Sequence, residues 1–281
     1  MRHFPLTSDA FEHSLGVRAI VNDEKLIEVT EHYRDEIDQK REQLASAIHE
    51  YACVPSELHD IQAEAVEFLL THCEHLLDGK NRLTNETMDT RLPPLLSIAL
   101  HVQEDLVILR NDPENDFPII AGVVCFPSGW SLPDKLGRGI LGVHEPVPDF
   151  NSILGAPTQN LMARLKIKRP VWRMNWGIRP TRQLDQSPRH EEFLTQQQAL
   201  VTSGNAGDRC FLRVERQTLS RLSKTGNILF TIHTHQTRLC DLANPQKHRL
   251  LRTLQTCPSE TLSYKGLATI AEPVIAFLQA Y

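Results

Sequence analysis

Five short segments between residues 101 and 240 limit most strongly what this chain can fold into. Each is rich in β-branched and aromatic residues and is bounded by Gly, Pro, Asn or Asp, as β-strands and their turns are. They are HVQEDLVILR from residue 101, FPIIAGVVCF from 117, PVWRMNWGI from 170, CFLRVERQTLSRL from 210 and NILFTIHTHQTRL from 227. Residues 223–226 (SKTG) form a hairpin-like connection between the last two. We therefore expect a mostly antiparallel sheet.

Helical patterns flank these strands. Apolar residues at helical spacing predict an exposed amphipathic helix over 28–50 and a second helix from Pro55 that stops near Gly79. Shorter helical stretches are expected over 95–100 and 151–167, and helices follow Cys240 to the end. The fold class is α+β, in one domain: an N-terminal helical region (1–95, with 1–27 irregular or at a sheet edge), a sheet core (96–240) and C-terminal helices (241–281).

Composition excludes several classes of protein. The 281 residues carry a formal net charge of −5, which argues against nucleic-acid or anionic-membrane binding. No apolar run is long enough to span a bilayer, and the first residues lack the apolar core of a secretory signal. Six cysteines without CxxC pairs argue against an iron–sulfur or zinc cluster and suit a cytoplasmic protein. No glycine-rich nucleotide-binding loop is visible.

The segment 125–151 is too rich in Pro and Gly for regular structure, yet it contains apolar residues such as Phe126 and Trp130. Such a loop favours the wall of a pocket. His144 lies in it, and Pro146 and Pro148 would hold the backbone that follows. A histidine held beside apolar residues could bind haem iron. Ordinary loop hydrogen bonding is the commoner role for such a histidine.

Three further segments carry polar chemistry. In the strand around residue 216, Glu215 faces one way while Arg216 and Thr218 face the other, so Arg216 could pair with a carboxylate in a cavity, or the strand could simply carry exposed salt bridges. His233 and His235 form an HxH pair that could chelate zinc or non-haem iron, but no third ligand is apparent. A stripe of two tryptophans around Met174 could be core or the wall of a flat aromatic cofactor.

Seven sequence motifs, taken together and in order, resemble the haem-dependent oxidative N-demethylase family over about residues 90–240. They are VQEDL at 102–106, CFPSGW at 125–130, Lys135 with Gly137 and Arg138, HEPVP at 144–148, PVWRMNW at 170–176, LRVERQTLSRL at 212–222 and GNILFTIHT at 226–234. The resemblance implies a PAS-like sheet that holds haem b and the oxygen-dependent demethylation of a small amine such as dimethylamine, with release of formaldehyde.

The resemblance also implies roles for individual residues. His144 matches the histidine of the family's H-x-P-V-P motif and is the expected iron ligand. Arg138, Arg173, Trp176 and Arg216 are the expected cofactor-binding residues, and Glu215, Arg216 and Thr218 are the expected catalytic residues. Glu215 or Glu104 could hold a protonated amine. Other residues are common in the family at the position of His233, which argues against a metal there.

The resemblance implies electron supply from outside the chain. No flavin site and no cysteine cluster is visible, so we expect a separate NADPH-linked reductase. Two other functions fit the residues: a haem-based gas or redox sensor, and a haem-free protein that binds another small molecule.

Overall fold

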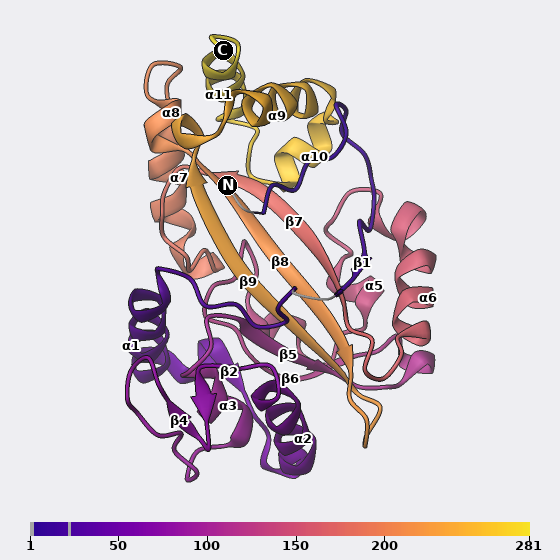
Figure 1. Cartoon of the computed structure of the whole chain (residues 1–281). Helices are drawn as coiled ribbons and strands as arrows, with labels where there is room; N and C mark the ends of the chain where they lie inside the picture. The colour runs from indigo at the N-terminus through magenta and orange to yellow at the C-terminus, as the bar shows by residue number, and fades with distance from the viewer. Residues whose placement is uncertain (1–2, 22–23) are drawn as a thin grey trace.

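The computed structural model describes residues 3–21 and 24–281, and its centre is an antiparallel sheet (Figure 1). In the described residues this sheet has seven strands in the order β1-β7-β8-β9-β5-β6-β2. The strands are β1 (Arg18–Ala19), β2 (Ala52–Cys53), β5 (Asp105–Leu109), β6 (Ile119–Val123), β7 (Val171–Arg179), β8 (Phe211–Arg221) and β9 (Ile228–Arg238). A separate hairpin pairs β3 (Leu76–Leu77) with β4 (Lys80–Asn81).

Helices lie around this sheet. The α-helices are α1 (Tyr33–Tyr51), α2 (His59–Leu70), α3 (Pro94–Ala99), α4 (Leu132–Lys135), α5 (Ile140–Val143), α6 (Ala156–Arg164), α7 (Glu191–Ala199), α8 (Ala206–Arg209), α9 (Asn244–Thr256), α10 (Ser259–Tyr264) and α11 (Ala271–Leu278). Single turns are η1 (Ser56–Leu58), η2 (Pro113–Asn115), η4 (Pro188–His190) and η5 (Leu239–Asp241), and η3 (Phe150–Gly155) is a π-helix. Among the described residues, no helix is long and apolar enough to cross a membrane.

The α+β class and the five expected strands are confirmed. Each expected segment forms one of β5 to β9, and β8 pairs with β9 along its whole length, from Phe211 opposite Arg238 to Arg221 opposite Ile228. The expected hairpin connection at 223–226 joins them, and Gly226 takes the positive φ of 72° that its turn requires. The expected edge structure before residue 27 is also present, since β1 pairs with β7.

The first helix begins at Tyr33, five residues later than the sequence predicts. The backbone N–H groups of Glu28 and Thr30 donate to the side chains of Glu104 and Gln103, and these bonds compete with helix formation. The helix is also less exposed than expected, because Lys40 is completely buried. Its Nζ lies 3.4 Å from Asp105 Oδ1 beneath the sheet.

Two other local predictions were wrong, and two helices were missed. The second helix ends at Leu70, well before Gly79, because Asp78 and Gly79 have positive φ values and form the turn of the β3–β4 hairpin. Helices α7 and α8 were not predicted. The segment 125–151 is not wholly irregular, since it contains α4 and α5.

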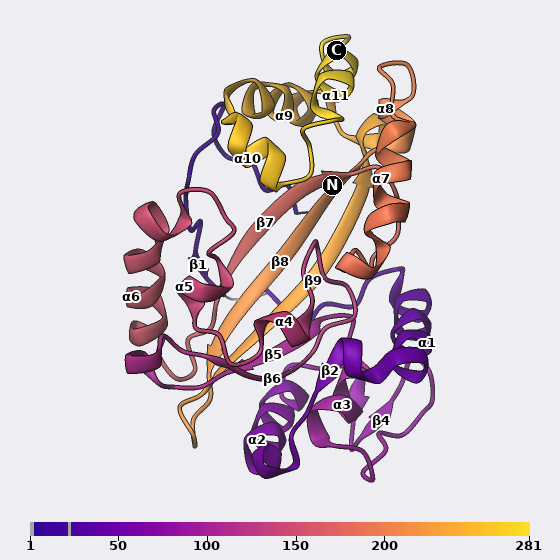
Figure 2. The ribbon, with the colours of Figure 1, turned by 180° about the vertical axis from the view of Figure 1, so that it is seen from behind.

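Strand alternation gives the ribbon β7–β8–β9 two chemically different faces. One face, called the loop face, presents Arg173, Asn175, Arg213, Glu215 and Gln217, which pair across β7 and β8. The other, called the histidine face, presents Trp172, Arg216, Thr218, His233 and His235, which are likewise in register. The N-terminal segment crosses the histidine face (Figure 1), and α4 and α5 lie over the loop face (Figure 2).

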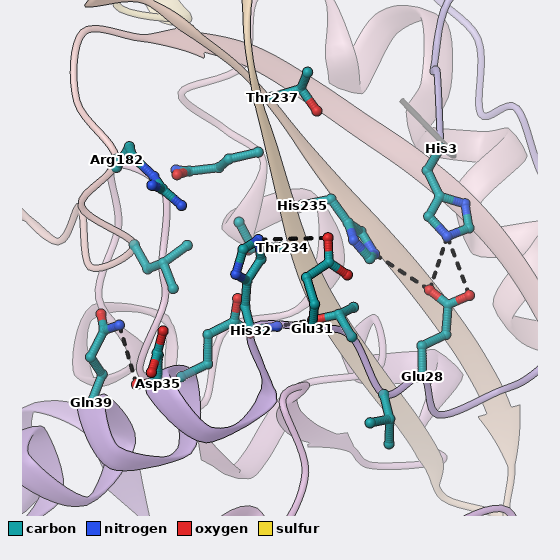
Figure 3. Close-up of a pocket in the computed structure, with 15 residues that line it drawn as sticks. His3, Glu28, Glu31, His32, Asp35, Gln39, Arg182, Thr234, His235 and Thr237 are labelled. Carbon is teal, nitrogen blue, oxygen red and sulfur yellow. Dashed lines mark hydrogen bonds and ion pairs between the residues drawn. The ribbon is translucent and has the colours of Figure 1, made fainter. Parts of the chain in front are cut away.

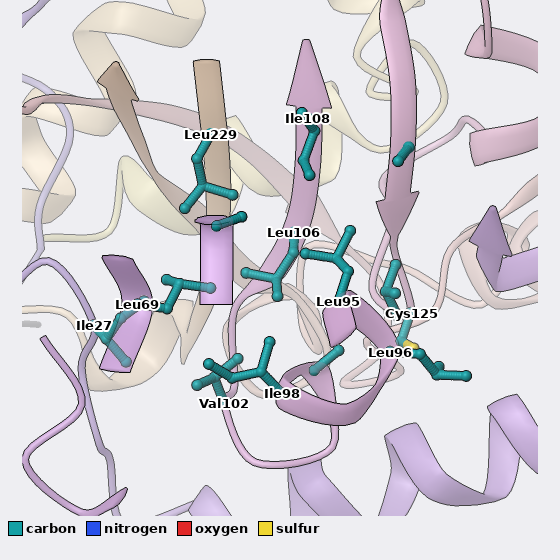
Figure 4. Close-up of a cluster of buried hydrophobic side chains, with 14 of the residues drawn as sticks. Ile27, Leu69, Leu95, Leu96, Ile98, Val102, Leu106, Ile108, Cys125 and Leu229 are labelled. Atoms are coloured by element: carbon teal, nitrogen blue, oxygen red, sulfur yellow. The ribbon is translucent and has the colours of Figure 1, made fainter. Parts of the chain in front are cut away.

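Apolar clusters hold the helices against both faces. Helices α2 and α3 pack on the histidine face of β5 and β9, where Leu69, Leu95, Leu106 and Leu229 are buried together (Figure 4). A second cluster joins α9 and α11 to Leu212 and Val214 of β8. A third lies on the loop face under α5 and α6. The middle of each face is left for polar residues.

Candidate functional site

His144 lies at the C-terminal end of α5, and its ring is held in one orientation. Its backbone N–H donates to Ile140 O at 3.1 Å, and its Nδ1 lies 2.8 Å from the same oxygen. The ring stacks on buried Phe150, with centroids 4.0 Å apart and planes 8° apart. Because a carbonyl oxygen only accepts, Nδ1 carries the proton and Nε2 keeps its lone pair. Among the described residues no hydrogen bond engages Nε2.

The surroundings of His144 favour neutral imidazole. Burial lowers its pKa, and the positive charges of Arg173 and Lys135 lower it further, against the opposing effect of the Ile140 carbonyl. Lys135 is itself fixed, because its Nζ donates to Val143 O at 2.7 Å. A neutral histidine whose Nδ1–H is bonded to a backbone carbonyl has the form that binds metals through Nε2.

A cavity of about 430 Å³ lies on the loop face, and its volume is within the range of sites for small molecules and cofactors. Strands β7 and β8 form one wall and helix α7 another, and residues around Ser128 and Lys265 complete it. Glu215 and Trp176 line this cavity. His144 and Arg173 are outside its lining. Arg173 lies two residues before Asn175, which does line the cavity, and its positive charge acts on the His144 ring.

Glu215 is the buried carboxylate of this cavity. It is 6% exposed, and its Oε2 accepts hydrogen bonds from Gln217 Nε2 at 3.0 Å and Asn175 Nδ2 at 3.3 Å. Its Oε1 lies 3.9 Å from Arg213 Nε. Two neutral amides therefore hold one oxygen of Glu215, and the guanidinium of Arg213 faces the other.

Buried cations surround Glu215. Burial lowers the pKa of Arg173, while the charge of Glu215 opposes that shift, and the buried Arg173 Nε makes no hydrogen bond within the described chain. Burial and the charge of Arg179 lower the pKa of Lys265 to about 8. Lys265 Nζ donates to Trp176 O at 2.8 Å and lies 4.8 Å from the centroid of the Trp176 ring. A positively charged rim of this kind favours anionic groups.

The structure does not bring all the expected site residues together. His144, Arg138, Arg173 and Glu215 lie around the loop face. Trp176 borders the cavity, but it pairs with Val214, so its ring points to the histidine face and packs against the cluster of α9 and α11. Arg138 is more exposed than the rest, and its Nη2 donates to Glu145 at 2.8 Å.

Arg216 and Thr218 point to the histidine face, as the alternation of their strand requires. Arg216 donates to Lys25 O at 2.5 Å and Leu26 O at 3.2 Å, and Thr218 Oγ1 lies 2.7 Å from Thr231 Oγ1. A single bound molecule therefore cannot contact both Glu215 and these two residues without crossing the sheet.

The family model for "Haem-dependent oxidative N-demethylase, alpha subunit-like" matches residues 17–275. The chain belongs to this family. The match extends well beyond the 90–240 segment that the motifs cover, and it includes the helices at both ends. Membership of this family supports a haem-dependent oxidative reaction of the N-demethylase kind as the general activity of the chain.

The loop face fits a haem in its donor set. His144 offers a neutral imidazole nitrogen, and Arg173 offers a half-buried guanidinium for an acidic substituent, since its Nε has no hydrogen-bond partner among the described residues. Arg179 and Lys265 were missed from the sequence. Arg179 follows the two-residue spacing of Arg173 and Asn175, which could have identified it. Lys265 directly follows the distant helix α10, and only tertiary packing brings it to Trp176.

Proposed function

We propose that this chain binds haem b on the loop face through Nε2 of His144 and oxidatively demethylates a small methylated amine of the dimethylamine type. The orientation of His144 carries the proposal: its Nδ1–H is committed to Ile140 O, its ring is stacked on Phe150, and its remaining nitrogen is neutral. Family membership supplies the haem dependence. We expect residues 1–281 to form a single haem-binding unit whose sheet has the PAS-like architecture of the family.

The overall reaction fixes what the protein must supply. The amine, dioxygen, two electrons and two protons give the demethylated amine, formaldehyde and water. Bound haem would supply the redox-active iron at which dioxygen is activated. The electrons would come from a separate NADPH-linked reductase. We place the protein in the cytoplasm, where its six free cysteines would stay reduced.

The chain's own residues would bind and orient the reactants. Glu215 would hold the protonated amine, since it is a buried carboxylate in the cavity wall. Arg173 would pair with an acidic group of the cofactor, and Trp176 would border the cavity from β7. Arg138 would serve the same purpose nearer the surface. Arg216 and Thr218 would act indirectly, from the histidine face, by holding β8 in place.

Formaldehyde release tests this function. Haem-loaded protein is supplied with dimethylamine, oxygen and a reducing system, and formaldehyde and oxygen uptake are measured together. We expect one formaldehyde for each oxygen consumed. A haem-loaded protein that consumes no amine under these conditions would favour a sensor instead.

Glu215→Gln tests the amine-binding role. This change keeps the size of the side chain and removes its charge, so we expect KM for the amine to rise at least tenfold and the amine-induced Soret shift to weaken. Glu104→Gln is the matched control, because Glu104 points to the histidine face beside His233. If Glu215→Gln leaves both KM and the spectral shift unchanged, the role of Glu215 is wrong.

A further inference from the structure

The histidine face carries a cluster that the demethylation reaction does not use. His3, Glu28 and His235 come from three distant parts of the chain, and one possible ligand atom from each lies within 4.8 Å of the others (Figure 3). His3 Nε2 is 3.0 Å from Glu28 Oε2, and His235 Nε2 is 3.4 Å from the same oxygen. The rings of His3 and His235 have centroids 4.7 Å apart.

These separations are those of ligands around one metal ion. Two ligand atoms bound at about 2.05 Å with a tetrahedral angle lie about 3.3 Å apart. The two measured distances to Glu28 Oε2 bracket that value. The HxH pair of the sequence therefore has partners, although its first histidine is not one of the three ligands. His233 is used in another way, because its Nδ1 lies 3.0 Å from Glu104 Oε1.

We propose that His3, Glu28 and His235 form a binding site for one divalent transition-metal ion. Two imidazoles and one carboxylate are the donor set of both catalytic zinc and non-haem iron sites. All three residues line a cavity of about 520 Å³, so coordination positions not taken by the protein face an open volume where water or a small ligand can bind.

The electrostatics of the cavity support a cation. Its lining contains four carboxylates (Glu28, Glu31, Asp35 and Glu36) and one guanidinium, that of Arg182. The side chains of His235 and Glu28 are only 17% and 5% exposed, so both ligands are largely shielded from solvent.

Neighbouring residues hold two of the three ligands in place. The His233 ring stacks on His235 with centroids 4.3 Å apart, and Glu104 accepts the backbone N–H of Glu28 at 2.9 Å. Such outer contacts orient metal ligands. Arg216 is the competing cation, since its Nε lies 4.0 Å from Glu28 Oε2. A test must therefore separate metal binding from a network of ion pairs alone.

Zinc binding to the full-length, haem-loaded protein provides this test. After dialysis against EDTA and removal of any histidine tag, Zn²⁺ is titrated by calorimetry. We expect one equivalent to bind saturably. In His3→Gln and in His235→Gln the affinity should fall at least about 100-fold, because losing a ligand should exceed the 10–100-fold effect of losing an outer-shell partner. His32→Gln is the control, because His32 lines the same cavity outside the cluster (Figure 3).

Absence of saturable binding in the wild type, or wild-type affinity in His3→Gln, would overturn the proposal. His3→Gln also protects the test against misfolding, since residue 3 lies in the N-terminal segment rather than in the sheet, and circular dichroism would confirm that the variant is folded. Haem content separates this site from the demethylase site. His3→Gln should keep the Soret band, and His144→Ala should keep the zinc site.

Discussion

The loop face and the histidine face are built by the same three strands, yet they offer different chemistry. The loop face gathers arginines and a lysine around one carboxylate, Glu215, and has a single oriented histidine at its margin. The histidine face gathers several carboxylates around a triad with two imidazoles. An anionic cofactor suits the first face and a metal cation suits the second. Period-two alternation along β8 and β9 is enough to keep the two environments separate.

Two adjacent acids anchor the two faces. Asp105 accepts the backbone N–H groups of Cys125 and Phe126 at 2.9 and 2.8 Å and lies near Lys40, so it fixes the start of the loop that covers the loop face. Glu104 points the other way and meets His233. The free energy of unfolding of variants at Asp105 and Glu104 shows how much each buried charge contributes to the stability of its face.

The largest effect on stability is expected from Asp105→Leu. It leaves the Lys40 ammonium buried without its ion-pair partner and two N–H groups without acceptors, at a cost of about 3–5 kcal/mol. Urea unfolding at pH 7 measures this. Glu104→Gln should cost less, about 1–3 kcal/mol, because its amide oxygen can still accept the Glu28 N–H. Adding Lys40→Met to Asp105→Leu should restore part of the loss. Equal costs for the two single variants would remove the distinction between the anchors.

The stability of the protein at acidic pH should depend on His235 of the histidine face. In the metal-free protein the pKa of His235 is about 4, below its unfolded value of 6.5, so the unfolded chain binds more protons between these values. Stability therefore falls as pH is lowered from 6.5 to 4, by up to about 3 kcal/mol from this group. His235→Gln should lose that part of the pH dependence. A variant with the same acid dependence as the wild type would contradict this assignment.

The stability of the protein at alkaline pH should depend on Lys265 beside the loop face. The pKa of Lys265 is about 8, below its ordinary value of 10.5, so its contribution to stability falls as pH is lowered from 10.5 to 8 and is constant below that. We expect Lys265 to change the free energy of unfolding by up to about 3 kcal/mol, and by less than that because solvent partly screens the exposed part of the side chain. Lys265→Met should flatten the difference between pH 8 and 10 and leave the acid range unchanged. A change in the acid range would show that the two faces are coupled.

The smallest effect is expected at the outer margin of the loop face. Arg138 pairs with Glu145 at 2.8 Å, but both side chains are exposed. Arg138→Gln should therefore cost less than about 1 kcal/mol in thermal or urea unfolding. A larger loss would mean that the pair supports His144, which lies next to Glu145 in the chain.

Local patterns were sufficient for the strands and for the division of β8 into two faces, because alternation needs no knowledge of distant residues. The composition of the 125–151 segment indicated His144, whereas the roles of Arg173 and Glu215 came from the family resemblance. Local patterns could not identify the partners of His235, since His3 and Glu28 are more than 200 residues away and only folding brings them together. The Asp78–Gly79 turn was predictable, but Gly79 was interpreted as a helix stop.

The absorption spectrum of the purified protein tests most directly the claim that His144 holds haem on the loop face. Wild type, His144→Ala and His235→Gln are reconstituted with haemin side by side, and the second histidine variant serves as a control on the opposite face. Our account predicts a Soret band of full intensity in the wild type and in His235→Gln, and its loss or a clear shift in His144→Ala. An unchanged Soret band in His144→Ala, or a loss confined to His235→Gln, would contradict it.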